Sequence, residues 1–117
     1  MKIISGKVIS GAGRGRKLGF PTANVKYSGR LSGVYAVRVD IAGRRYKGVA
    51  NIGYAPTFGR KTKLLEVYIF NFSRSITGKN IGVEIVKKLR DEKKFGSANE
   101  LAKEIKKDVR KAKKILH

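Results

Sequence analysis

Residues 11–24 hold the densest group of side chains that could do chemistry in this chain of 117 residues. They read GAGRGRKLGFPTAN, so four glycines and three basic residues stand beside a Phe-Pro pair that leads into Thr22 and Asn24. Glycines allow backbone amides to approach a ligand closely, and amides with cationic side chains can hold phosphate groups. Thr22 and Asn24 supply two neutral oxygens of the kind that Mg²⁺ binds. The segment therefore indicates a nucleotide phosphate and its metal.

The same residues allow simpler interpretations. The spacing of Gly11, Gly13 and Gly15 fits neither a dinucleotide fingerprint nor a Walker loop, and no helical pattern follows it. A basic turn that contacts RNA phosphate therefore stays open. If the chain after Pro21 is extended, Thr22 and Asn24 point to the same side, because side chains alternate along a strand. Thr and Asn are also common in capped turns, so a purely structural role stays open as well.

Net charge limits the partners of the protein. The chain has 28 basic and 8 acidic residues, a formal charge of +20. Such a balance is typical of nucleic-acid-binding proteins, but a site for a polyanionic small molecule or a lysine-rich thermophile proteome also fits it. Much of the charge lies on one face of the C-terminal segment, at Lys103, Lys106, Lys107, Arg110, Lys111, Lys113 and Lys114.

Composition excludes several kinds of chemistry. The chain has no cysteine, and its one histidine is the last residue, His117, which rules out disulfides and argues against a histidine triad or a zinc site. No apolar run approaches the roughly 18–20 residues that span a membrane, and the first residues do not resemble a secretory signal. We therefore expect a cytoplasmic protein, with one domain over residues 1–117 and no membrane partner.

The first ninety residues are patterned as strands and turns. Residues 34–41 alternate, with Tyr35, Val37, Val39 and Ile41 on one face, and residues 45–52 should return as a hairpin. Residues 65–72 and 81–86 are further β-prone runs, and residues 3–10 form a β-rich lead-in. Short strands between turn signals favour a closed or nearly closed antiparallel barrel over residues 1–90.

The last twenty residues predict a helix, over about 97–116. Ser97 and Glu100 have the spacing of a capping box. Apolar residues then recur on one helical face, at Leu101, Ile105, Val109, Ala112 and Leu116. We expect this amphipathic helix to close the barrel, with mobile loops at residues 60–64 and 90–96.

Several motifs together carry a family resemblance over nearly the whole chain. The most specific is GFPTAN at residues 19–24, followed by GVANIG at 48–53, PTF at 56–58 and LEV at 65–67. Further matches are Gly78-Lys79, Leu89-Arg90, Glu92, Lys94-Phe95, and Asp108 and Ala112 in the C-terminal helix. In this order the chain resembles the riboflavin kinase (flavokinase) domain of bacterial and eukaryotic type.

The resemblance implies a mainly β fold, a six-stranded antiparallel Greek-key barrel with a C-terminal helix. It implies transfer of the γ-phosphate of ATP to the ribityl 5′-hydroxyl of riboflavin, giving FMN and ADP. By this resemblance Glu66 is the catalytic carboxylate, and Thr22 and Asn24 hold the phosphates and Mg²⁺, with Mn²⁺ or Zn²⁺ as other metals. The phosphate flap comprises Gly11, Gly13, Arg14, Gly15, Arg16 and Lys17, and the flavin side comprises Arg90, Glu92 and Phe95.

Elementary chemistry agrees with these roles. Phosphoryl transfer needs positioning, charge neutralisation and a group that takes the hydroxyl proton, and a placed carboxylate such as Glu66 can take it. A carboxylate in a strand is often simply exposed, and residues 89–93 could be an ordinary charged loop. An arginine plane can stack on an aromatic ring, which makes a flavin contact by Arg90 plausible.

The sequence departs from the family pattern at several positions, but not at Thr22, Asn24 or Glu66. Thr77 replaces an aromatic residue, Tyr68 a histidine, Asn71 an aspartate and Ala55 an arginine, and residues 73–75 lack the usual acidic character. These changes concern the substrate loops more than the reaction. The chain also leaves no room for the adenylyltransferase domain of bifunctional relatives, so we expect a monofunctional, monomeric enzyme that stops at FMN.

Two further hypotheses remain beside the kinase. One is a basic β-barrel that binds nucleic acid, and the other is a regulatory module that binds flavin without turnover. Turnover of riboflavin with ATP and Mg²⁺ separates the kinase hypothesis from these two alternatives.

Overall fold

The computed structural model describes residues 2–11, 13–54 and 61–117, with the side chain of Arg14 left out. The PTF motif at 56–58 and the departure at Ala55 lie outside these residues. The elements in chain order are β1 (Lys2–Ile9), α1 (Arg14–Lys17), β2 (Ala23–Lys26), β3 (Gly33–Ile41), β4 (Arg44–Gly53), β5 (Leu64–Ile69), β6 (Asn80–Arg90) and α2 (Ala98–Leu116).

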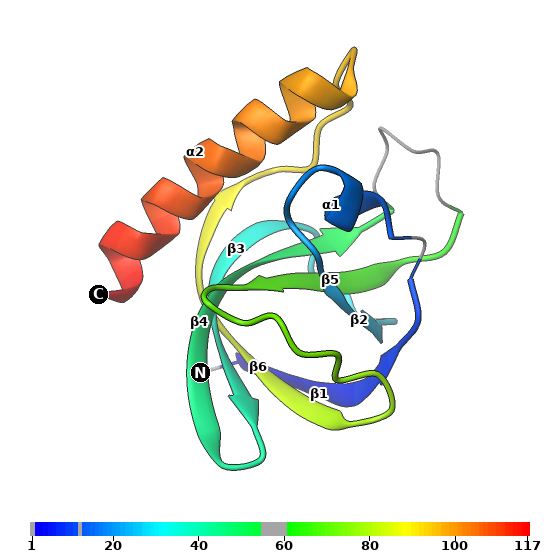
Figure 1. Cartoon of the computed structure of the whole chain (residues 1–117), viewed down its shortest axis with the longest axis vertical. Coiled ribbons are helices and arrows are strands. Elements are labelled where there is room, and N and C mark those ends of the chain that lie inside the picture. The colour runs from blue at the N-terminus through cyan, green and yellow to red at the C-terminus, as the bar shows by residue number, and fades with distance from the viewer. Residues whose placement is uncertain (1, 12, 55–60) are drawn as a thin grey trace.

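The six strands close into an antiparallel barrel in the order β1-β2-β5-β4-β3-β6 (Figure 1). The predicted fold class is thus confirmed. β-Branched and other apolar side chains of every strand fill the barrel, because alternate residues of a strand face inward. On β3 these are Tyr35, Val37, Val39 and Ile41, as the alternation predicted. The residues between them face the outer wall, where the polar chemistry lies.

The hairpin between β3 and β4 is confirmed in its register. Ile41 pairs with Arg44, which leaves Ala42 and Gly43 as a two-residue loop. Both have positive φ angles, 50° and 82°, as a tight hairpin turn of this hand requires. The turn sets the register of β4 against β3 and so decides which β4 side chains reach the outer wall.

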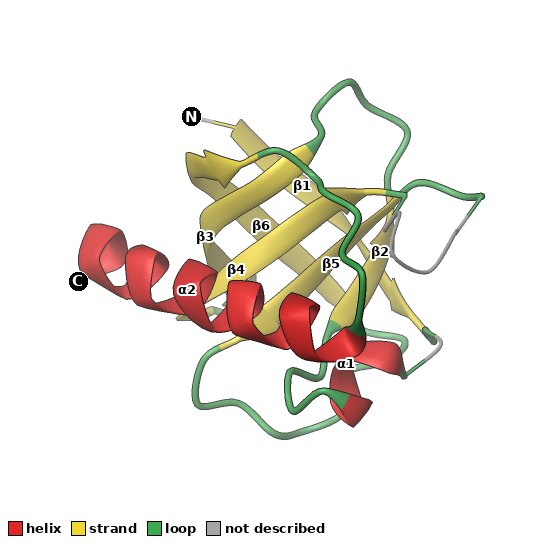
Figure 2. Cartoon of the chain, turned by 90° about the horizontal axis from the view of Figure 1, so that it is seen from above, coloured by secondary structure: helices red, strands yellow, loops and turns green. Residues whose placement is uncertain are grey.

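α2 lies along the outside of the barrel, against β3, β4 and β6 (Figure 2). Ser97 caps it by accepting a hydrogen bond from the Glu100 amide at 3.2 Å, as predicted. The Glu100 carboxylate turns back to the Gly96 amide at 3.1 Å. Ala112 and Leu116 pack with Val34, Ala36, Val49 and Phe70 in a second apolar cluster outside the barrel. Asp108, a charged residue, is buried on the same side of the helix.

Three local predictions were wrong. Residues 14–17 form a single helical turn, which no apolar periodicity announces; Gly13 and Gly19 begin and end it with φ angles of 72° and 89°. β5 ends at Ile69 rather than residue 72, because Asn71 has a φ of 54° and turns the chain. β6 runs on to Arg90, so Arg90 is held in a strand and only residues 91–97 connect to α2.

Among the described residues, no helix combines the length and apolar character that crossing a bilayer demands.

Candidate active site

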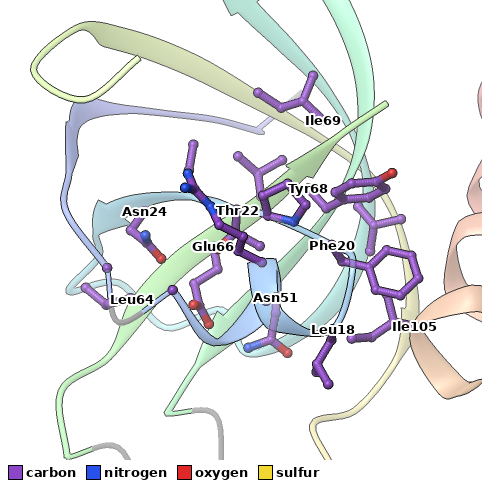
Figure 3. Close-up of a pocket in the computed structure, with 18 of the residues that line it drawn as sticks. Leu18, Phe20, Thr22, Asn24, Asn51, Leu64, Glu66, Tyr68, Ile69 and Ile105 are labelled. Atoms are coloured by element: carbon purple, nitrogen blue, oxygen red, sulfur yellow. The ribbon is translucent and has the colours of Figure 1, made fainter. Parts of the chain in front are cut away.

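A row of side chains crosses the outer wall of the barrel from strand to strand. Asn24 on β2 pairs with Glu66 on β5, and Glu66 pairs with Asn51 on β4. Asn51 pairs in turn with Val34 on β3, which pairs with Arg90 on β6. Directly paired residues point to the same face of a sheet. The row therefore sets one carboxylate between two amides, and Figure 3 shows Glu66 lying between Asn24 and Asn51.

This row forms part of the floor of a cavity of about 760 Å³. Its walls come from α1 and the segment after it, from residues 72–77, from the 91–95 connection and from the inner side of α2. A cavity of this size is typical of a small-molecule site. Among the described residues, no three His, Cys, Asp or Glu side chains group as metal ligands, so a cation here would depend on neutral oxygens and on its ligand.

Thr22 and Asn24 both line the cavity. This agrees with the prediction that the two side chains share one side of the chain after Pro21. The Asn24 side chain is buried, and its Oδ1 has no hydrogen-bond partner within the described part of the chain. A buried carbonyl oxygen without a partner is costly unless a ligand or water satisfies it. The amide lies directly against Gly11, where any Cβ would collide with it. The donor chemistry at this point therefore fits a Mg²⁺ ion.

α1 and the turn after it fold over this end of the cavity. The Phe20 amide donates to the Gly15 carbonyl at 2.7 Å and brings the chain back on itself. A Cβ at Gly15 would collide with the Phe20 carbonyl oxygen, so the turn needs glycine there. Phe20 meets the Tyr68 ring edge to face at 5.2 Å. Of the predicted flap residues, Gly11, Gly13, Gly15 and Arg16 line the cavity.

The far end of the cavity is fixed by an ion pair between β6 and α2. Arg90 donates from Nε to Asp108 Oδ1 at 3.0 Å and from Nη2 to Asp108 Oδ2 at 2.8 Å. The Asp108 side chain is only 2% exposed. Burial raises the pKa of the Asp108 carboxyl, and the hydrogen bonds from Arg90 oppose that rise. The Arg90 guanidinium also lies 5.6 Å from the Phe95 ring centre. One arginine thus joins the last strand, the connection after it and the helix.

Glu92 fixes the same connection to the end of β4. Its carboxylate accepts hydrogen bonds from Asn51 Nδ2 at 2.8 Å and from the Tyr54 amide at 3.0 Å. Gly53 leaves the space that this carboxylate occupies, and it has a φ of 151°, which favours glycine. Asn51 therefore links the row on the barrel wall to the loop that borders the cavity.

The structure brings most of the predicted site residues together. Glu66, Thr22, Asn24, Arg90, Glu92 and Phe95 line one cavity with the flap glycines and Arg16. Lys17 is exposed and does not line it, and the side chain of Arg14 lies outside the described ones.

Two residues of the site were not assigned a role from sequence. Asn51 is a polar residue inside an apolar strand, and Asp108 is an acid on the apolar stripe of a helix. Each breaks a hydrophobic pattern, and such a break is the signal that could have identified it.

Comparison with known proteins agrees with this geometry. The flavokinase (riboflavin kinase) family model matches residues 2–116. The chain belongs to the flavokinase family. An RNA-binding riboflavin kinase, RibR, of Bacillus subtilis is 46% identical over 112 residues, covering 93% of this chain and 49% of that protein. The bifunctional riboflavin kinase/FMN adenylyltransferase of the same organism is 44% identical over 116 residues, covering 93% of this chain and 37% of the relative.

Solved structures show the same fold. Riboflavin kinase from Trypanosoma brucei aligns with a TM-score of 0.67 and 25% identity, covering 97% of this chain and 78% of that one. A Streptococcus pneumoniae protein described as a macrolide-efflux protein aligns with a TM-score of 0.83 and 34% identity, over 95% of this chain and 38% of that one. This flavokinase chain spans about half or less of the length of the two Bacillus relatives.

Proposed function

We propose that this flavokinase domain transfers the γ-phosphate of ATP to the ribityl 5′-hydroxyl of riboflavin, giving FMN and ADP. The observation that carries the proposal is the row Asn24–Glu66–Asn51, which sets a carboxylate on the cavity floor beside a buried oxygen suited to a cation. Family membership supports the substrates.

Glu66 is the base in this proposal. Its carboxylate accepts the proton of the 5′-hydroxyl while the hydroxyl oxygen bonds to the γ-phosphorus and the bond from that phosphorus to the ADP oxygen breaks. Asn24 and Asn51 flank Glu66 on the two strands that pair with β5. Because the floor is a rigid sheet, the carboxylate needs little reorganisation when the substrates bind.

The Gly11–Asn24 end of the cavity takes the nucleotide. Thr22 and Asn24 would hold Mg²⁺, which when bound neutralises charge on the phosphates. Gly11, Gly13 and Gly15 allow backbone amides to approach these phosphates, and Arg16 adds a positive charge at the cavity edge. Lys17, which is exposed, adds positive charge from outside the cavity.

The opposite end takes the flavin. Phe95 offers an aromatic surface for the isoalloxazine ring, while Arg90 and Glu92 hold the 91–95 connection that carries it. Arg90 therefore acts by positioning, since its hydrogen-bonding edge is turned to Asp108.

The decisive assay follows FMN formation from riboflavin, ATP and Mg²⁺ by the wild type and by Glu66→Gln. We expect wild-type turnover, a loss in kcat of about 10²–10⁴-fold in the variant, and an unchanged Tm. Glu104→Gln, which changes a carboxylate of the same type on α2, is the matched control and should keep full activity. Full activity of Glu66→Gln would remove Glu66 from the reaction. Flavin binding without wild-type turnover would favour a regulatory module, and salt-sensitive RNA binding without turnover would favour the nucleic-acid-binding barrel.

A further inference from the structure

The solvent side of α2 carries an unbroken run of cations. Seven exposed basic residues lie on it between positions 103 and 114 of the helix: Lys103, Lys106, Lys107, Arg110, Lys111, Lys113 and Lys114. At 1.5 Å per residue, the stretch from Lys103 to Lys114 is about 17 Å long. Figure 1 shows α2 on the outside of the molecule, with its other side against the barrel. We call these seven residues the α2 basic face.

The acidic residues of the chain do not balance this face. Six of the eight acids have hydrogen-bond or ion-pair partners within the fold: Asp40, Glu84, Asp91, Glu92, Glu100 and Asp108. Glu66 lies on the cavity floor, which leaves Glu104 beside the seven cations. Within the described part of the chain, no ion pair involves a member of the α2 basic face. The positive charges of these seven residues therefore combine into a positive potential on the solvent side of α2.

The α2 basic face is separate from the proposed active site. The cavity is lined by the opposite side of the helix, through Leu101, Ile105 and Asp108. All seven are exposed and none lines the cavity, although Lys113 Nζ also lies 5.4 Å from the centre of the Phe70 ring. The phosphoryl-transfer chemistry therefore does not explain them, and a partner on this face would leave the cavity open.

We propose that the α2 basic face binds the phosphate backbone of a nucleic acid, largely independently of base sequence. A polynucleotide presents closely spaced negative charges along a line, and a row of lysines along a helix complements it. Six of the seven residues are lysines, whose ammonium groups act as point charges, and phosphate contacts of this kind position a protein without reading bases. The proposal is independent of kinase activity.

A membrane surface fits the same charges less well. Helices that bind an interface insert an apolar side, and the apolar side of α2 is buried against the barrel. The large apolar residues exposed in the described structure are Ile3 and Tyr54, and neither lies on α2. Electrostatics alone would thus have to hold a membrane.

The test compares two variants of the full chain that lose the same charge. One replaces a stripe of the α2 basic face (Lys103→Gln, Lys107→Gln, Arg110→Gln and Lys114→Gln). The other replaces four exposed residues on the β1–β2 side and the adjoining loops (Lys7→Gln, Lys26→Gln, Arg30→Gln and Lys61→Gln). Binding to short labelled RNA and DNA duplexes of mixed sequence is measured by fluorescence anisotropy across a salt series, and Tm and FMN formation serve as controls for folding.

We expect the wild type to bind, with little dependence on sequence. The helix variant should bind at least about tenfold more weakly at about 0.1 M salt, with a salt dependence shallower by about 3 in slope, while the barrel variant changes little. RNA and DNA arms then show which polynucleotide is preferred. No binding by the wild type, or equal losses in the two variants, would overturn the proposal. Binding to phosphatidylserine vesicles but to neither duplex would overturn it in favour of a membrane.

Discussion

The two ends of the cavity are built in opposite ways. At the end proposed for the nucleotide, Asn24 keeps a buried oxygen without a partner among the described residues, and Gly11 leaves room for its amide. At the end proposed for the flavin, Arg90 is hydrogen-bonded to Asp108, and Glu92 accepts hydrogen bonds from Asn51 and from the Tyr54 amide. The first end is prepared to receive polar atoms from a ligand. At the second end the polar groups are bonded to one another, so they stabilise the protein rather than wait for a ligand.

This difference follows from what each ligand part needs. A metal-bound triphosphate is highly charged, so the end proposed for it must offer amide donors to the phosphates and an oxygen ligand to the metal. A flavin ring is a flat, largely apolar surface, so its end must offer a rigid shape. Residues of the same chemical class thus differ in role: in the proposed reaction the carboxylate of Glu66 faces the substrates, whereas that of Asp108 binds Arg90 and holds α2 to β6.

The largest expected effect comes from removing the ion pair between Arg90 and Asp108. Arg90→Ala leaves the buried Asp108 carboxylate without its partner and should lower the free energy of unfolding by about 3–5 kcal/mol at neutral pH. Urea denaturation measures it. The matched control, Arg110→Ala on the solvent side of the helix, should change stability by less than about 0.5 kcal/mol. An equal effect of the two variants would contradict the structural role of Arg90.

The same variant makes a pH prediction. Without Arg90, the largest influence opposing the burial that raises the pKa of Asp108 is gone and only the charge of Lys111 still lowers it, so the folded state takes up a proton more readily than the unfolded state. The deficit of Arg90→Ala relative to the wild type should therefore be full at neutral pH and shrink as the pH falls through the raised pKa. Denaturation curves of both proteins at neutral and mildly acidic pH test this. A deficit that grows on acidification would contradict it.

A smaller effect is expected at the nucleotide end. A Cβ at Gly11 collides with the Asn24 amide, so Gly11→Ala should displace that amide and weaken Mg-ADP binding by about 10–100-fold, equivalent to about 1.4–2.7 kcal/mol. Calorimetric titration measures it, with Gly43→Ala at the distant hairpin turn as the control that leaves affinity unchanged. Normal Mg-ADP affinity in Gly11→Ala would show that the position of Asn24 is not critical.

The smallest effect concerns the 91–95 connection. Glu92→Gln keeps the shape of the side chain but replaces one acceptor oxygen with a donor, so one of the hydrogen bonds from Asn51 and Tyr54 is lost. We expect KM for riboflavin to rise about three- to tenfold with kcat nearly unchanged, which corresponds to about 1 kcal/mol for one such bond. Steady-state kinetics with riboflavin varied measures it. A change confined to KM for ATP would assign Glu92 to the other end.

Local sequence patterns predicted those features of the fold that depend on residues close together in the chain. The β3–β4 hairpin follows from alternation around Ala42-Gly43, the cap of α2 from Ser97 and Glu100, and the shared side of Thr22 and Asn24 from a period of two. The resemblance to the family predicted the number of strands in the barrel and the role expected of Glu66.

What could not be predicted depends on contacts between distant strands. The row Asn24–Glu66–Asn51 arises from the register of three strands, and no local pattern fixes that register. The partner of Arg90 lies 18 residues away on a helix. α1 is a single turn held by Gly13 and Gly19, too short for a periodic signal.

The most direct test of the two-ended site measures the two ligands separately. Mg-ADP and FMN are titrated by calorimetry into the wild type, Asn24→Ala and Phe95→Ala. We predict that Asn24→Ala weakens Mg-ADP at least tenfold and leaves FMN affinity within about twofold, and that Phe95→Ala does the reverse. If both substitutions weaken the same ligand, or each weakens both ligands equally, the cavity does not have a nucleotide end and a flavin end.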